Sequence, residues 1–140
     1  MQVLSLGHVH LKVRELERSI EFYEWVTGYA VSERLGNYAF LSDGKSHHVV
    51  ALQALGESAE SPSRRAVGLY HVAFEVSSDE EYKKLVERIG ERVRVTSVDH
   101  GISWASYFED PDGNGVEIYV DRRHSRDGSP NWASHLARNH

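Results

Sequence analysis

Two stretches of the chain alternate strictly between aliphatic and polar residues. Residues 7–13 carry an aliphatic side chain at every second position, with His8 and His10 between them. Residues 70–76 repeat the alternation, beginning with His71. Period-two alternation places the aliphatic side chains on one face of a β-strand and the intervening residues on the other. The pattern therefore predicts two strands whose histidines lie on the face away from the aliphatic stripe.

Each predicted strand is followed by a stretch of helical periodicity. Within residues 14–28 the apolar side chains fall at helical spacing, and Gly28 is suited to end the helix. In the second half, residues 78–81 form a helix-start signature, and the apolar stripe over residues 82–89 closes at Gly90. Three strand candidates follow each helix: residues 29–34, 38–41 and 49–52, then residues 93–98, 102–108 and 116–120.

The two halves of the chain follow one order of elements. His8 and His71 lie 63 residues apart, and Gly28 and Gly90 lie 62 apart. A long period used only twice indicates a duplicated module rather than a repeat array. We expect an α+β fold of two tandem βαβββ modules, in which pairing of the modules covers the sheet face that each leaves open.

Within this plan, module one covers about residues 3–55 and module two residues 67–122. The polar, Pro- and Ser-containing residues 56–66 read as a linker. We interpret residues 1–122 as a single domain. The tail, residues 123–140, is open to two interpretations: a short helix packed on the domain, or a contact with a partner subunit.

Composition narrows the classes of function. The 140 residues are 40% hydrophobic and 26% charged, which suits a globular chain of one-domain length. The net charge of −5 argues against nucleic acid or an anionic membrane as the main partner. With no cysteine, the chain has no disulfide, thiolate ligand or cysteine nucleophile. It shows neither a signal-peptide pattern nor an apolar stretch of membrane-spanning length, so we expect a cytoplasmic protein.

The candidate chemistry rests on two histidines and a carboxylate. His8 and His71 occupy matching positions in the two modules, and Glu117 points away from its aliphatic neighbours on the final predicted strand. Two imidazoles and one carboxylate make the facial triad that suits iron(II), while zinc, manganese or nickel would accept the same ligands. A single strand histidine is more often an ordinary core or surface residue than a ligand, whereas two at matching positions together with a strand carboxylate are harder to explain in that way.

Four segments of the sequence resemble the vicinal oxygen chelate superfamily: Leu6–Leu11, Glu21–Tyr23, Tyr70–Phe74 and Tyr107–Tyr119. This superfamily contains glyoxalase I, bleomycin- and fosfomycin-resistance proteins and type I extradiol dioxygenases. The resemblance covers roughly residues 4–122. It implies that the two βαβββ modules form an incomplete barrel around a metal. In iron-binding members, the ligands match His8, His71 and Glu117.

Within the superfamily, the chain resembles catechol 2,3-dioxygenase-like members most. Tyr107 stands ten residues before Glu117, where those enzymes place an active-site tyrosine. His48 matches their acid–base histidine, and His100 resembles a further active-site histidine. The spacing of seven residues from His100 to Tyr107 is shorter than in the larger dioxygenases. Many of those enzymes also have two such domains, where this chain has one.

The resemblance implies an iron(II)-dependent extradiol dioxygenase that cleaves a catechol-like aromatic ring with O2. His48 would act as general base and then acid, and Tyr107 would donate a hydrogen bond to an oxygen of the substrate. Mn2+, Zn2+ or Ni2+ remain possible metals. We expect a homodimer whose partners are the small substrate and O2, with no nucleic acid or membrane.

Two other functions stay open. In a glyoxalase-, isomerase- or epimerase-like enzyme, the last strand of module one supplies a fourth ligand; matching Gly44 to Gly113 puts His48 at that position. The third possibility is a metal-free protein that binds or sequesters a drug. Among the remaining histidines, we expect His10 to line the pocket. We expect surface positions for three histidines in the tail: His124, His135 and His140.

Overall fold

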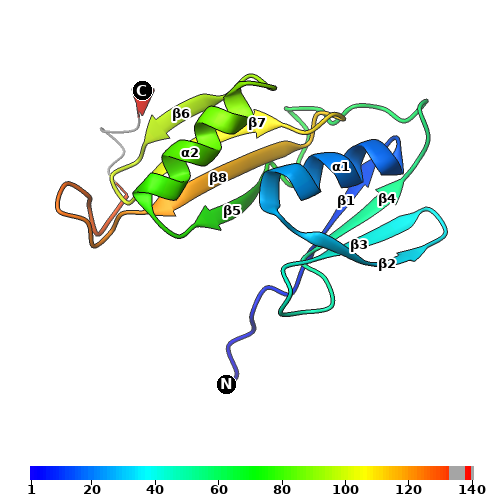
Figure 1. Cartoon of the computed structure of the whole chain (residues 1–140), viewed down its shortest axis with the longest axis horizontal. Helices are drawn as coiled ribbons and strands as arrows, with labels where there is room; N and C mark the ends of the chain where they lie inside the picture. Colours follow the sequence, from blue (N-terminus) through cyan, green and yellow to red (C-terminus); the bar gives the residue numbers. More distant parts are fainter. Residues whose placement is uncertain (133–137, 140) are drawn as a thin grey trace. The chain divides into compact units, whose positions relative to one another are not determined.

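The computed structural model describes residues 1–132 and 138–139 and divides the chain into two compact units. Unit 1 is Met1–Ser63 and unit 2 is Arg64–His140. Each unit contains one sheet with one helix lying across it (Figure 1).

Unit 1 has the element order βαβββ. Its sheet is ordered β1-β4-β3-β2, with β1 parallel to β4 and the other neighbours antiparallel. The elements are β1 (Val9–Val13), α1 (Leu16–Thr27), β2 (Ala30–Leu35), β3 (Tyr38–Ser42) and β4 (Val50–Ala54).

Unit 2 repeats this order, and its sheet is arranged β5-β8-β7-β6-β9, with β5 parallel to β8. The elements are β5 (Val72–Val76), α2 (Asp79–Gly90), β6 (Thr96–Asp99), β7 (Ser103–Glu109), β8 (Gly115–Asp121) and β9 (Arg138–Asn139). The first four strands of this sheet correspond one for one to the sheet of unit 1, and β9 is an addition at its edge. The α+β class and the twice-used βαβββ order are therefore confirmed.

Local sequence sets the ends of α1. The Glu15 carboxylate caps the first turn by accepting hydrogen bonds from the backbone N–H groups of Glu17 and Arg18, at 3.3 and 2.7 Å. At the other end Gly28 adopts a φ of 77°, and its N–H donates to the Glu24 carbonyl. Glycine reaches this left-handed conformation without strain, which is why the helix ends there.

One face of each sheet is covered by its helix. In unit 1 this face carries a continuous set of buried aliphatic residues: Leu11, Val13, Ala39, Leu41, Val50 and Leu52. In unit 2 the corresponding set is Val72, Phe108, Val116, Ile118 and Val120. Because side chains alternate across a strand, the residues between these positions lie on the opposite face of each sheet. Tyr107 and Glu117, two of the candidate site residues, belong to that opposite face.

A buried arginine fixes the far end of β8 to α2. The Arg122 side chain is 5% exposed, donates to Asp79 at the start of α2 over 2.8 Å, and also bonds Asp127. Its guanidinium lies 3.7 Å from the centre of the Trp104 ring. Burying a guanidinium is costly unless it is paired, and here two carboxylates and an aromatic face provide that pairing.

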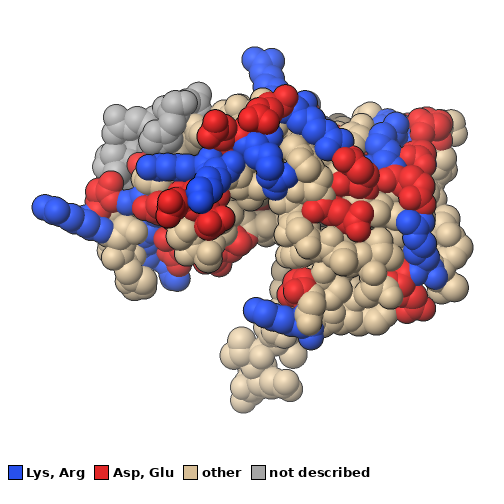
Figure 2. Space-filling view, in the orientation of Figure 1, with Lys and Arg blue, Asp and Glu red and all other residues tan. Residues whose placement is uncertain are grey.

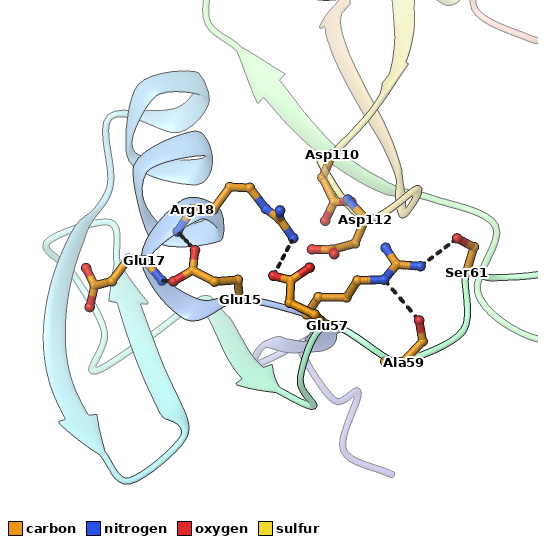
Figure 3. A network of polar contacts seen from close by, with 9 residues as sticks. Glu15, Glu17, Arg18, Glu57, Ala59, Ser61, Asp110 and Asp112 are labelled. Atoms are coloured by element: carbon orange, nitrogen blue, oxygen red, sulfur yellow. Dashed lines mark hydrogen bonds and ion pairs between the residues drawn. The ribbon is translucent and has the colours of Figure 1, made fainter.

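The segment that follows β4 is held against the start of α1 (Figure 3). Arg18 pairs with Glu57 at 3.7 Å, and Arg14 donates to the Ala59 carbonyl and to the Ser61 hydroxyl at 2.9 and 2.7 Å. The predicted linker therefore begins as an ordered part of unit 1, although its composition reads as a loop.

The structure differs from the sequence-based expectation in small respects. The first strand of each unit begins at Val9 and Val72, so His8 and His71 come directly before a strand rather than inside it. The second helix runs through Gly90 and is capped by Glu91. Neither helix of the described chain has the length and apolar character needed to cross a membrane. Acidic and basic side chains are interspersed on the visible surface (Figure 2).

Candidate functional site

The open face of the second sheet carries the predicted carboxylate ligand. Glu117 is the third residue of β8, and its neighbours in the sheet are Ala73 on β5 and Tyr107 on β7. Paired residues on adjacent strands project to the same face, so Tyr107 and Glu117 share the face opposite α2. The Glu117 side chain is 12% exposed, which is unusual for a carboxylate and requires partners.

His71 is the first of those partners. Its Nε2 lies 2.9 Å from Glu117 Oε1. Its other ring nitrogen, Nδ1, is buried and has no hydrogen-bond partner in the part of the chain that the structure describes. Glu117 is therefore the group that orients this imidazole.

Glycine makes this approach of β5 and β8 possible. A Cβ atom at Gly115 would lie 2.3 Å from the Tyr70 carbonyl oxygen and 3.1 Å from His71 Cβ. Only glycine fits at this position. In the preceding turn, the Asp110 carboxylate accepts from the N–H groups of Asp112 and Asn114, both at 2.9 Å. The turn and the glycine together set the course of β8 and so the position of Glu117.

Tyr107 and His100 extend the network. The Tyr107 hydroxyl is hydrogen-bonded to Glu117, and it also lies 2.7 Å from His100 Nε2. Since a carboxylate can only accept, the hydroxyl donates to Glu117, and His100 must donate its Nε2–H to the Tyr107 oxygen. This arrangement leaves His100 Nδ1 as an unprotonated acceptor, buried without a partner among the described residues. The spacing of seven residues between His100 and Tyr107 is thus compatible with direct contact of their side chains.

Burial governs the protonation of this network. It raises the pKa of Glu117, an effect that the nearby His71 and the Tyr107 hydrogen bond partly offset. Burial, together with the charge of Glu117, raises the pKa of Tyr107 to about 12. Burial also lowers the pKa of His100, against the influence of Asp99. At neutral pH the tyrosine is therefore a hydrogen-bond donor, and the histidine is uncharged.

The other predicted residues, His8 and His48, come together in unit 1. Their rings lie 4.5 Å apart between centroids, tilted by 48°. Phe40 on β3 meets the His48 ring edge-on at 5.0 Å, and His47 Nδ1 lies 2.9 Å from His48 Nδ1. Burial, and then the charges of His8 and His47, lower the pKa of His48. At neutral pH His48 is accordingly an uncharged imidazole, which can accept a proton or bind a metal.

His10 lies on the same face of the first sheet but is engaged elsewhere. Its Nε2 is 2.9 Å from Gln53 Oε1, and its ring meets Tyr38 edge-on at 5.7 Å. Tyr38 in turn stacks on Phe40 at 6.2 Å. His10 is therefore part of an aromatic row on this face, and its place in a pocket stays a prediction.

Strand pairing corrects one step of the sequence analysis. His10 pairs with Ala51 as Ala73 pairs with Glu117, so the unit 1 equivalent of Glu117 is Ala51 and not His48. Matching Gly44 to Gly113 is wrong because the β3–β4 and β7–β8 turns differ in length and geometry. Module symmetry therefore gives His48 no role as a ligand.

The predicted site residues form two sets, His71, Glu117, Tyr107 and His100 in unit 2, and His8 with His48 in unit 1. Across the residues that the structure describes, no three His, Asp or Glu side chains are grouped so that they could hold a metal ion. Neither unit alone thus supplies a three-ligand site.

One contact in the tail was missed by sequence reasoning. Trp132 stacks on the His100 ring, with centroids 4.0 Å apart and an angle of 28°. Trp132 lies beyond the second module, and no pattern in the sequence around it indicates a contact with His100. His124 is exposed as expected, whereas His135 and His140 lie outside the described residues, as does any helix over residues 133–137.

Comparison with known proteins places this geometry in context. Residues 5–118 match the family model described as the Glyoxalase/Bleomycin resistance protein/Dioxygenase superfamily. The chain is 34% identical to the Catechol-2,3-dioxygenase of Bacillus subtilis (strain 168) over 86% of its own length and 42% of that protein. It is 32% identical to the Metallothiol transferase FosB of Lysinibacillus sphaericus (strain C3-41), over 86% of this chain and 84% of the relative.

Among solved structures, the chain resembles a glyoxylase/bleomycin resistance protein/dioxygenase domain from Frankia sp. EAN1pec. The TM-score is 0.72 at 22% identity, covering 86% of this chain and 100% of that one. At 22% identity the structural match supports the fold alone. The chain spans less than half the length of the Bacillus dioxygenase, so the match covers only part of that protein.

Proposed function

Because the chain belongs to the Glyoxalase/Bleomycin resistance protein/Dioxygenase superfamily, we propose that it is an iron(II)-dependent extradiol dioxygenase that acts on a catechol-like aromatic. The observation that carries this proposal is the connected set His100–Tyr107–Glu117–His71, in which a buried carboxylate faces an imidazole on one side and a phenol on the other. The 34% identity to the Bacillus catechol-2,3-dioxygenase supports the same class of substrate.

The donor atoms of this set fit a divalent metal. Nitrogen and oxygen ligands bind such ions at about 2.0–2.2 Å, so two ligands at right angles lie roughly 3 Å apart. His71 Nε2 and Glu117 Oε1 lie 2.9 Å apart, and both present lone pairs when the imidazole is neutral and carries its proton on Nδ1. One carboxylate and imidazole nitrogens form the donor set of iron(II) oxygenases. We propose His8 of unit 1 as the third ligand.

A metal held by His71, Glu117 and His8 would supply Lewis acidity and would bring a catechol and dioxygen together. The remaining work belongs to the protein's own side chains. Tyr107 keeps its proton at neutral pH. That proton points to Glu117 in the free protein, and its role in the reaction would be to turn to a substrate oxygen once substrate is bound. His100 holds the phenol oxygen in place through its Nε2–H.

We assign the proton transfer to His48. It lies beside His8, one of the proposed ligands, and is an uncharged imidazole at neutral pH. Its role is to take a proton from the substrate hydroxyl and to return it later in the reaction. Phe40, against the edge of its ring, limits the orientations that the imidazole can adopt.

A colour assay tests the proposal. Protein reconstituted with Fe2+ without air, then given catechols and air, is expected to form yellow ring-opened products. Glu117→Gln should bind no iron and form no product, because the amide lacks the charge of the carboxylate. Glu109→Gln is the matched control, since Glu109 is the last residue of β7 and is half exposed. Bound iron without colour over a broad catechol panel would count against the proposal.

The second candidate is a glyoxalase- or isomerase-like enzyme in which His48 is a fourth ligand. The 4.5 Å between the His8 and His48 rings favours it, because both imidazoles could reach one ion. It predicts that His48→Ala weakens metal binding. The dioxygenase proposal predicts that the same variant keeps its metal.

A further inference from the structure

The tail that follows β8 returns to the candidate site. The Ser129 N–H donates to the Gly101 carbonyl at 2.9 Å, which ties the tail to the turn between β6 and β7. Gly128 passes so close to the Arg122 carbonyl that a Cβ atom would lie 1.7 Å from its oxygen. Two contacts therefore fix the path of the chain toward Trp132, although these residues lie beyond the 5–118 segment shared with the family.

At the end of this path Trp132 stacks on His100. The ring centroids are 4.0 Å apart and the planes are within 28° of parallel. The Trp132 ring is about half exposed, at 54%, while His100 beneath it is 7% exposed. The half-exposed indole thus covers one face of the buried imidazole.

His100 has little else to hold its ring. One side-chain hydrogen bond, from Nε2 to the Tyr107 oxygen at 2.7 Å, is its only polar contact among the described residues, and Nδ1 has none. The Tyr107 ring also meets the imidazole edge-on at 6.1 Å, so both of these contacts come from Tyr107. Stacking against the planar Trp132 side chain opposes rotation of the imidazole out of its plane.

The consequence reaches Glu117. While the Tyr107 oxygen accepts from His100, the hydroxyl is held with its own proton directed to Glu117. An imidazole that turned away would leave the phenol free to rotate or to donate elsewhere. The orientation of the phenol thus depends on that of the imidazole, and the orientation of the imidazole depends on the stacked indole.

We propose that Trp132 is a positioning residue, which holds the His100 imidazole in the plane where Nε2 faces the Tyr107 hydroxyl and so fixes the phenol against Glu117. Its effect on turnover rests on the proposed dioxygenase function. Its effect on the His100 and Tyr107 rings does not, and can be measured in the metal-free protein.

NMR of the metal-free protein tests the structural half. Stacking under an indole shifts the ring C–H signals of His100 upfield. In Trp132→Ala these signals should move downfield, and the Tyr107 ring signals should move as well. Trp132→Phe should keep most of both shifts, because a smaller aromatic ring still stacks. Trp25→Ala, on α1 in unit 1, is the matched control and should change neither residue.

Kinetics test the functional half with the same variants. Trp132→Ala should lower kcat about 10- to 100-fold, the range found when a supporting partner of a catalytic group is lost, with little change in KM. Trp132→Phe should recover most of kcat. Trp132→Leu keeps an apolar side chain without the ring and should resemble Trp132→Ala. This variant also covers the case in which alanine impairs folding.

The outcomes separate this inference from the proposed function. Unchanged His100 signals in Trp132→Ala would overturn the positioning role. The positioning role would also be overturned if the His100 signals moved in Trp132→Ala while kcat stayed unchanged. The same holds if kcat of Trp132→Phe were no higher than that of Trp132→Ala. Wild-type protein that turns over no catechol would refute the proposed function. In that case the Tyr107 signals alone decide: movement in Trp132→Ala upholds the positioning role, and no movement overturns it.

Discussion

At the scale of single residues, Glu117 shows how burial and partners are balanced. A carboxylate taken out of water favours its neutral form, and the raised pKa of Glu117 reflects that cost. His71 and the Tyr107 hydroxyl oppose the shift from two sides. A positive ion beside this carboxylate would stabilise its charged form and so offset the free-energy cost of burying it.

Tyr107→Phe removes the one donor in this network that can face a substrate oxygen. The ring and its packing remain, so folding should be preserved. If the hydroxyl stabilises negative charge that develops on the substrate, turnover should fall about 10²–10³-fold. Tyr70→Phe is the control, because that residue is exposed and precedes β5. A rate for Tyr107→Phe equal to that of the wild type would make the tyrosine a structural residue only.

His48→Ala separates proton transfer from metal binding. The variant should retain stoichiometric iron, because His8, His71 and Glu117 remain. It should lose about 10²–10⁴-fold in turnover, the usual contribution of a general acid–base group. Elemental analysis and steady-state kinetics on the same sample check both halves. His124→Ala, an exposed tail residue, serves as the control. Loss of iron in His48→Ala would instead favour the glyoxalase-like candidate.

At the scale of elements, α2 is joined to its sheet by a buried pair of hydroxyls. The Tyr82 hydroxyl lies 2.6 Å from Ser106 Oγ, which in turn lies 2.7 Å from Ser97 Oγ. Burial raises the pKa of Tyr82 above its ordinary value of 10.0. A raised pKa in the folded state means that the neutral phenol is favoured by folding. Its stabilisation is complete below pH 10 and is lost as the pH rises through the folded pKa.

Tyr82→Phe is therefore expected to act differently at two pH values. At pH about 8 the variant should lose about 1 kcal/mol of unfolding free energy, the net value of one hydrogen bond. Between pH about 8 and about 11 the wild type should lose more stability than the variant does. Urea unfolding at both pH values measures this difference. Equal losses in the two proteins would show that Tyr82 does not carry the alkaline sensitivity.

The elements also show what sequence patterns can and cannot predict. Alternation and helical periodicity predicted every element from β1 to β8 within a few residues, because each sheet has one buried face that the pattern records. The two-residue strand β9, Arg138–Asn139, is too short for such an alternation, and its pairing with β6 has no signal in the sequence. The true equivalent of Glu117 depends on strand register, which residue counting across turns of different length could not reveal.

The candidate site was predictable in part for the same reason. His71, Glu117 and Tyr107 were found because their spacing in sequence matches a family pattern, and the structure brings these three together. Trp132 was not predicted, since a stacked aromatic far along the chain has no local signature. Its contact with His100 depends on how the tail is anchored by Ser129.

At the scale of the whole molecule, the proposed ligands are divided between the two units. His71 and Glu117 come from unit 2 and His8 from unit 1. If all three bind one ion, His8→Ala should lose stoichiometric iron even though the His71–Glu117 pair is intact. His10→Ala is the matched control, two residues away and hydrogen-bonded to Gln53. Full iron content in His8→Ala would show that unit 2 binds the metal without it.

Metal binding should also stabilise the folded chain. A ligand that binds only the native state adds about 2.7 kcal/mol at a free concentration of one hundred times its Kd. Iron should therefore raise the melting temperature of the wild type and not that of His8→Ala, while a chelator should reverse the effect.

Anomalous X-ray scattering at the metal absorption edges, recorded on crystals grown without chelator, tests the central claim most directly. It identifies the element and locates its ligands together. We predict iron coordinated by the imidazoles of His8 and His71 and the carboxylate of Glu117, with His48 close by but not coordinated. An anomalous peak surrounded by other side chains, or no peak after iron reconstitution, would contradict the account.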